Sequence, residues 1–238
     1  MNKKFQALSL VCSVAIWATV GNASAAGTAT FGITGVITPN SCDITLGGGG
    51  IANYGTHLKT AVQNFATSTG AGGVPVYVLS SIGAGTISGA SPTIPVAIVC
   101  SAPTKAELSF VDNNSAQRFG GDALAYGVAD GTSSVPVGSY LVGFANASLD
   151  GVTAAGYLTA PNGSTAWSTT GPTGQSASFV APGYTVGFIK AVANTTPDTF
   201  TNMSGNLYTQ LFVSKNYVDA ATNTIQLNGT GTVTLVYL

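Results

Sequence analysis

Short runs of alternating apolar and polar residues, separated by turns rich in glycine and proline, occupy most of this 238-residue chain, which holds 31 Gly and 10 Pro. A period of two places the apolar side chains on one face of an extended strand. Turns at such close intervals leave little room for helices. The sequence therefore predicts an all-β fold of many short strands, with no helix.

The alternation is strongest near the two ends of the chain. Near the beginning, one strand face is predicted to carry Ala29, Phe31, Ile33, Gly35 and Ile37. After Pro39 the apolar phase shifts to Cys42, Ile44 and Leu46, and the last stripe is Val233, Leu235 and Tyr237. Between them lie stripes at 94–100, at 106–110 after an expected turn at Pro103, at 140–144 and at 184–188, and a weaker one at 207–213.

Residues 1–25 have the anatomy of a secretory signal peptide. A basic head with Lys3 and Lys4 precedes an apolar run over 7–20, and Ala23-Ser24-Ala25 gives a small-x-small cleavage pattern. The run is shorter than the roughly 20 residues that a membrane-spanning helix needs. We expect cleavage before Ala26, export from the cytoplasm, and a single domain over 26–238 that is not an integral membrane protein.

Cysteine usage agrees with export. Cys12 leaves with the signal peptide, and Cys42 and Cys100 remain as an even pair for an oxidising compartment. A disulfide between them would close a loop of about 60 residues and raise the free energy of unfolding by about 4 kcal/mol. The alternative is two buried free thiols. A zinc site is not expected, because the chain has no C-x-x-C spacing and one histidine, His57.

The remaining composition argues against catalysis and against nucleic acid. Charged residues make up 6% of the chain, the net charge is −1, and no basic patch is present. The acids are scattered singly, and no nucleophile motif accompanies His57. Asp112-Asn113-Asn114 is better explained as a turn than as a calcium loop. We expect no enzyme, no metal and no cofactor.

Four motifs resemble those of the chaperone–usher fimbrial subunits, or pilins. The signal peptide leads into the alternating segment 27–37, and Pro39-Asn-Ser-Cys42 follows. Ile98-Val-Cys100 ends an apolar strand, and the chain stops on an alternating strand with a penultimate tyrosine, Tyr237. The Pro-x-x-Cys start and this ending look like a less characterised fimbrial-like branch of the family.

The resemblance implies an immunoglobulin-like β-sandwich that lacks its final strand and carries one disulfide, between Cys42 and Cys100. In that family a periplasmic chaperone lends a strand to the gap, and the N-terminal extension of another fimbrial subunit replaces it at the outer-membrane usher. Carried over, the candidate assembly contacts are Val233, Leu235, Tyr237 and the Leu238 carboxylate. The implied partners are chaperone, usher and other subunits, and the implied location is a surface fimbria contributing to adhesion.

Three questions stay open from the sequence. Family members carry about ten residues or more before their first strand, whereas only Ala26 to Thr28 precede the Phe31 stripe here. The 29–37 stripe is therefore either a donor strand or the first strand of a subunit that does not donate. Alternatives to a structural or accessory subunit are a tip adhesin, for which Tyr157 and Trp167 are candidate ligand contacts, and an outer-membrane β-barrel.

Overall fold

The computed structural model describes residues 40–79, 81–83, 86–88, 91–172 and 178–238. All of them belong to one compact unit, Pro39–Leu238. The predicted signal peptide, 1–25, and the predicted strand with Ala29, Phe31, Ile33, Gly35 and Ile37 lie outside the described residues.

Strands dominate the described residues. The strands are β1 (Cys42–Leu46), β2 (Thr67–Thr69), β3 (Pro75–Val78), β4 (Ser81–Gly83), β5 (Thr86–Ser88), β6 (Thr93–Asp112), β7 (Tyr126–Asp130), β8 (Pro136–Leu149), β9 (Val152–Thr153), β10 (Gly156–Pro161), β11 (Phe179–Val180), β12 (Tyr184–Ile189), β13 (Thr199–Ser214), β14 (Leu227–Asn228) and β15 (Gly231–Tyr237). The helices are all short: η1 (Gly47–Gly50), α1 (Lys59–Val62), η2 (Ala71–Gly73), η3 (Ser115–Gln117), η4 (Phe119–Gly121) and α2 (Lys215–Ala220). The all-β prediction is confirmed, and the expectation of no helix is wrong at these short segments.

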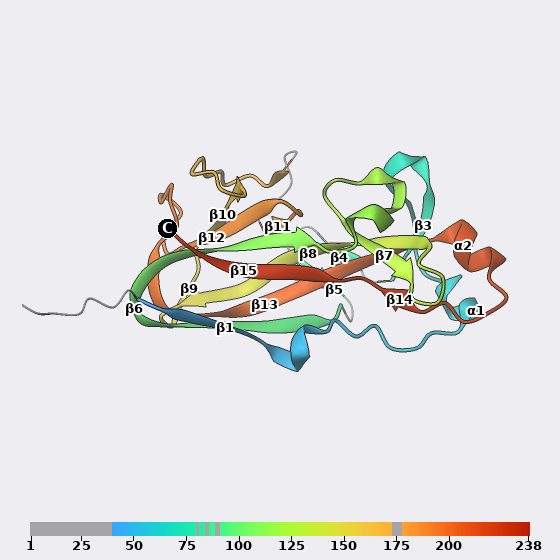
Figure 1. Ribbon diagram of the computed structural model, residues 1–238, viewed down its shortest axis with the longest axis horizontal. Helices are drawn as coiled ribbons and strands as arrows, with labels where there is room; N and C mark the ends of the chain where they lie inside the picture. Colours follow the sequence, from blue (N-terminus) through green and yellow to red (C-terminus); the bar gives the residue numbers. More distant parts are fainter. Residues whose placement is uncertain (1–39, 80, 84–85, 89–90, 173–177) are drawn as a thin grey trace, which may run out of the picture. The chain divides into compact units, whose positions relative to one another are not determined.

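Thirteen of the described strands form one hydrogen-bonded antiparallel sheet, and β4 and β5 form a separate hairpin. The long strand β6 joins two groups of strands within this sheet. Its first half pairs with β1 and with β13, which continues through β8 and β7 to β14. Its second half pairs with β15 on one side and with β12 and then β10 on the other. Figure 1 shows β6 curving from the level of β1 to the level of β15.

The expected turn at Pro103 is wrong, because β6 runs through it without a break. The pairing with β1 ends at Cys100, and the pairing with β15 begins at Ala106. Pro103 therefore stands where the strand changes partners, and a missing N–H costs little at such a point.

The main core lies between the two groups of strands. Phe144 of β8 makes edge-to-face contacts with Phe110 of β6 and Phe188 of β12, at centroid distances of 6.0 and 5.2 Å. The inward residues of β6, such as Ile98 and Leu108, are almost completely buried. Alternation in the sequence predicted these faces correctly, because the apolar inward residues recur two positions apart.

A second, smaller apolar cluster lies where α1, β3 and α2 meet the ends of β7, β8 and β13. Asp219 of α2 fastens this end of the molecule. It accepts hydrogen bonds from Gln63 (2.8 Å) and the Tyr77 hydroxyl (2.9 Å), and it pairs with Lys215 one turn away. These contacts, with Gln63 first and Lys215 next, lower the pKa of Asp219 to about 2.

Candidate functional site

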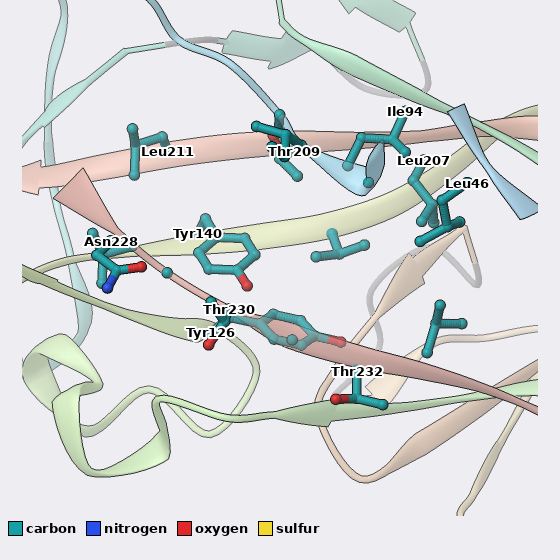
Figure 2. Close-up of a pocket in the computed structure, with 18 of the residues that line it drawn as sticks. Leu46, Ile94, Tyr126, Tyr140, Leu207, Thr209, Leu211, Asn228, Thr230 and Thr232 are labelled. Atoms are coloured by element: carbon teal, nitrogen blue, oxygen red, sulfur yellow. The ribbon is translucent and has the colours of Figure 1, made fainter. Parts of the chain in front are cut away.

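An apolar groove opens between the β1 side and the β15 side of the molecule. It has a volume of about 540 Å³. Its floor is core side chains of β6, β7, β8 and β13, including Ile94, Val142 and Leu207. One wall is Leu46 with the segment that follows it, and the other runs from β14 through Val233. Figure 2 shows the labelled side chains from these elements around the space. None of the described lining residues is charged.

Two tyrosines stack on the floor of the groove. The rings of Tyr126 and Tyr140 lie 5.0 Å apart at an interplanar angle of 22°. The Tyr126 hydroxyl donates to the Val180 carbonyl at 3.2 Å. Burial raises the pKa of both hydroxyls above the ordinary value for tyrosine. Both rings therefore stay neutral at physiological pH, and the groove floor stays uncharged.

Gly229 allows the wall to approach the Tyr140 ring. A Cβ atom at this position would lie 2.7 Å from the Tyr140 Cε1 atom, which is too close for any side chain. Glycine therefore lets the segment between β14 and β15 pass directly over the floor.

The walls of the groove are strand edges. In the described part of the chain, β1 and β15 each pair with β6 alone, and each therefore has a second edge that is not hydrogen-bonded to a strand. The inward side chains of these strands, Ile44 and Leu46 on β1 and Val233 and Leu235 on β15, are only half-buried. The β6 residues opposite them are buried. The core is thus incomplete along one line, between β1 and β15.

The backbone of β15 offers hydrogen-bonding groups toward this line. Asn113 donates to the Thr230 carbonyl at 3.0 Å, and Leu238 donates to the Lys105 carbonyl at 3.0 Å. In an antiparallel pair every second residue bonds the same neighbour. The even-numbered residues of β15 therefore bond β6, and the N–H and C=O groups of Gly231, Val233 and Leu235 lie on the free edge.

The same parity holds on β1. Ser101 donates to the Ser41 carbonyl at 2.8 Å, so Asp43 and Thr45 are in phase to bond β6. Cys42 faces Cys100 directly and forms the disulfide. The backbone groups of Cys42, Ile44 and Leu46 therefore lie on the free edge.

One end of the groove is closed and the other is open. At the closed end the disulfide fixes Cys42 to β6, and the Cys42 N–H donates to the Tyr237 hydroxyl at 2.7 Å. At the open end the exposed apolar side chains Ile51 and Leu227 form the rim, 69% and 40% exposed.

Asp130 holds the open-end wall in place. Its carboxylate accepts from the Thr132 N–H and hydroxyl, from the Tyr217 hydroxyl and from the Gln226 N–H, directly before β14. These hydrogen bonds, with the Thr132 N–H first, lower the pKa of Asp130 to about 2. These bonds tie the chain directly before β14, where this wall begins, to the end of β7.

The structure brings together part of the predicted site. Cys42 and Cys100 form the predicted disulfide. Val233 and Leu235 face the groove side of β15, Tyr237 lies at its closed end, and Leu238 follows the strand with 48% of its surface exposed. Tyr157 packs on Phe144 and Phe188 in the core, and Trp167 is half-buried against Gly187, so neither aromatic is a fully exposed ligand contact.

Sequence reasoning missed most of the groove lining. The alternating pattern places Leu46 on a strand, but it does not reveal the partner of Leu46 across the groove, and it does not single out Ile51, Tyr126 or Leu227. The available signal is weak: a large apolar residue directly after the four consecutive glycines at 47–50, and another directly before Asn228-Gly229.

The segment Asp112-Asn113-Asn114, weighed above as a turn or a calcium loop, forms a turn in the structure. Asp112 is buried, pairs with Arg118 at 2.7 Å and accepts from the Asn114 and Gly127 N–H groups, which fits a turn. In this part of the chain no three His, Cys, Asp or Glu side chains gather as metal ligands. Nor does it contain a helix of the length and apolar character needed to cross a membrane.

Comparison of the chain with protein-family models, with curated proteins and with solved structures found no match.

Proposed function

We propose that this protein is a structural or accessory subunit of a bacterial surface fimbria, assembled by donor-strand complementation and contributing to adhesion. In this proposal the fold is an immunoglobulin-like sandwich of pilin type that lacks one strand. The chain is exported through the periplasm, where a chaperone holds it, and an usher in the outer membrane exchanges that chaperone for another subunit.

One observation carries the proposal: an uncharged apolar groove lies between two free strand edges. An unpaired edge is a template for pairing with another chain. Strand addition supplies main-chain hydrogen bonds to the edge and apolar side chains to the pockets. Gly231 and Val233 offer the hydrogen bonds here, and the half-buried Leu46 and Val233 offer the apolar contact.

The energetic argument points the same way. Complete burial of a valine or leucine side chain is worth about 1.5–3 kcal/mol, and the side chains that line this groove have gained only part of that. An inserted strand would cover them and complete the core. The sequence motifs that resemble pilins add support, because the predicted assembly contacts Val233, Leu235 and Tyr237 all lie on the strand that borders the groove.

The alternative of a tip adhesin is not favoured by any particular contact. Its two candidate aromatics, Tyr157 and Trp167, are packed against other residues of the chain.

A peptide-binding experiment tests the proposal. A synthetic peptide with the sequence of residues 27–37 is added to the purified full chain, and the unfolding midpoint and the dissociation constant are measured. A ligand at 100 times its dissociation constant stabilises by about 2.7 kcal/mol. For a domain of this size that corresponds to a rise in midpoint of roughly 5–11 °C.

Two substitutions on one strand provide the contrast. Val233→Asp places a charge in the groove and is expected to weaken peptide binding at least tenfold. Thr234→Asp is the matched control, because Thr234 is exposed on the opposite face of β15 and should leave binding unchanged. Unfolding midpoints without peptide establish that both variants fold. A peptide that fails to bind at about 1 mM, the weak end of specific affinities, or that binds both variants alike, would contradict the proposal.

A further inference from the structure

Tyr237 links the two walls of the groove at its closed end. Tyr237 is the last residue of β15 and is 50% exposed, and its side chain reaches across to β1, where the hydroxyl accepts the Cys42 N–H at 2.7 Å. The partners are 195 residues apart in the chain. This hydrogen bond joins strands that share no backbone pairing.

The bond engages a particular backbone group. Because Asp43 and Thr45 are the β1 residues in phase to bond β6, the Cys42 N–H points away from β6, along the free edge. A strand added to β1 would need that N–H. The Tyr237 hydroxyl therefore occupies the first hydrogen-bonding position of the free edge.

The groove ends where this link begins. Its lining includes Leu46 on β1 and Val233 on β15, but neither Ile44 nor Leu235, which are the next inward residues toward the closed end. On the β15 side the lining starts at Leu227. At about 3.3 Å per residue, the distance along the wall from Leu227 to Val233 is roughly 20 Å. That length holds a strand of about six residues.

We propose that Tyr237 holds the closed end of the groove shut and thereby limits strand addition to a short segment that is seated from the open end, beside Ile51 and Leu227. The inference rests on the proposed function and specifies the partner of the same site. The partner segment is uncharged and extended, with about three apolar side chains at alternate positions facing the floor, because the described lining carries no charge and a strand has a period of two.

Hydrogen exchange tests the closure without any ligand. Tyr237→Phe removes the hydroxyl and keeps the ring, and amide exchange is followed residue by residue in the full chain. Exchange at Cys42 should accelerate about tenfold or more in the variant. The neighbouring amide of Asp43, which is in phase to bond β6, should not change. Tyr184→Phe removes a hydroxyl at the start of β12 and should leave both amides unchanged.

Equal exchange at Cys42 in the wild type and in Tyr237→Phe would overturn the role of Tyr237. Equal acceleration at Cys42 and Asp43 would overturn it as well, because that result would mean general loosening of β1 and not the loss of one bond.

Peptides of two lengths test the limit on the partner. One has the sequence of residues 27–37, and the other has that of residues 29–34, Ala-Thr-Phe-Gly-Ile-Thr, which carries three apolar side chains at alternate positions. The wild type should bind both peptides with dissociation constants within about twofold of each other, because the groove offers no binding position to the extra residues of the longer peptide. In Tyr237→Phe the longer peptide should bind about fivefold tighter, in line with a net gain of about 1 kcal/mol for one newly available hydrogen bond, and the shorter one should be unaffected.

A wild type that already binds the longer peptide more than fivefold tighter, or a variant that gains nothing with length, would overturn the limit. Failure of both peptides to bind either protein would overturn the proposed function and the length limit together. The exchange rates would then still decide whether Tyr237 holds the closed end shut.

Discussion

The two outer strands of the group β15–β6–β12–β10 differ in how far their outer edges are hydrogen-bonded. The edge of β10 is covered by the chain itself: Thr159 donates to the Ser168 carbonyl at 2.8 Å, and the Ser168 N–H donates back at 2.9 Å. The Thr159 hydroxyl adds a bond to the Thr170 carbonyl at 3.1 Å. The edge of β15 has no such cover in the described residues, and the Tyr237 side chain at its end bonds the edge of β1 instead.

Under the proposed function, the difference separates an edge that is protected from association from an edge that is left open to it. Unpaired edges invite pairing with other chains, and natural proteins usually cover or charge them. This chain covers β10 with the segment after Pro161 and leaves β15 beside an uncharged groove. An open edge next to half-buried apolar side chains is costly for a chain that stays alone, which supports the proposal that a partner strand covers it.

The largest expected effect comes from breaking the disulfide that holds β1 at the groove. Cys42→Ser should destabilise the chain by about 4 kcal/mol, because the bond closes a loop with a sequence separation of 58. That loss corresponds to a midpoint lower by roughly 8–16 °C. Thermal unfolding of the purified protein measures it.

The double variant Cys42→Ser, Cys100→Ser is the control for this prediction. It should unfold at nearly the same midpoint as the single variant, since one bond is lost in both. A single variant as stable as the wild type would mean that the disulfide constrains little, and the β1 wall would then have another support.

A smaller effect is expected from uncovering the β10 edge. Ser168→Pro removes the N–H that binds the Thr159 carbonyl, at a cost of about 1–2 kcal/mol. The change is made in the Val233→Asp background, so that the groove does not contribute. The exposed edge should then give self-association that grows with concentration, measured by sedimentation.

Ser168→Ala is the matched variant here, because it keeps the backbone N–H while losing the side chain. It should remain as monomeric as the Val233→Asp background. If both variants associate equally, or if neither associates, the Thr159–Ser168 bridge does not protect the β10 edge. That result would contradict the contrast drawn between the β10 and β15 edges.

The sequence predicted the strands well because each stripe is a local pattern. Ile44 and Leu46 on β1, and Val233 and Leu235 on β15, were assigned to the correct faces from a period of two alone. Pro103 was misread because a proline normally ends a strand. Its position at the change of partners along β6 depends on β1 and β15, which lie far from it in sequence.

The residues that line the groove could not be predicted from local sequence patterns. Leu46 and Val233 are separated by most of the domain, and nothing local indicates that both side chains line one groove. The link from Tyr237 to Cys42 depends on the orientation of one ring across the same gap. Alternation predicts which face of a strand is apolar, but it does not predict which edge of that strand is left unpaired.

The smallest expected effect is at Glu107, which lies on β6 between the β10 edge and the β15 edge. A substitution there tests whether stability can change without a change in edge protection. Its side chain is 3% exposed, and its Oε2 atom has no hydrogen-bond partner in the described part of the chain. Burial raises the pKa of this carboxyl above its ordinary value, although a hydrogen bond with Thr185 opposes the shift. The folded state therefore holds the proton more tightly than the unfolded state, and stability is lost as the pH rises through the folded pKa.

Glu107→Gln removes that loss because the amide carries no charge at any pH. The variant should be more stable than the wild type near pH 7.5, with a higher unfolding midpoint, and the gain should shrink as the pH falls toward 4. A gain that is the same at both pH values would trace the effect to packing and not to ionisation. Association should not change at either pH, since the substitution uncovers neither the β10 edge nor the β15 edge; if it does change, stability and edge protection are coupled through β6.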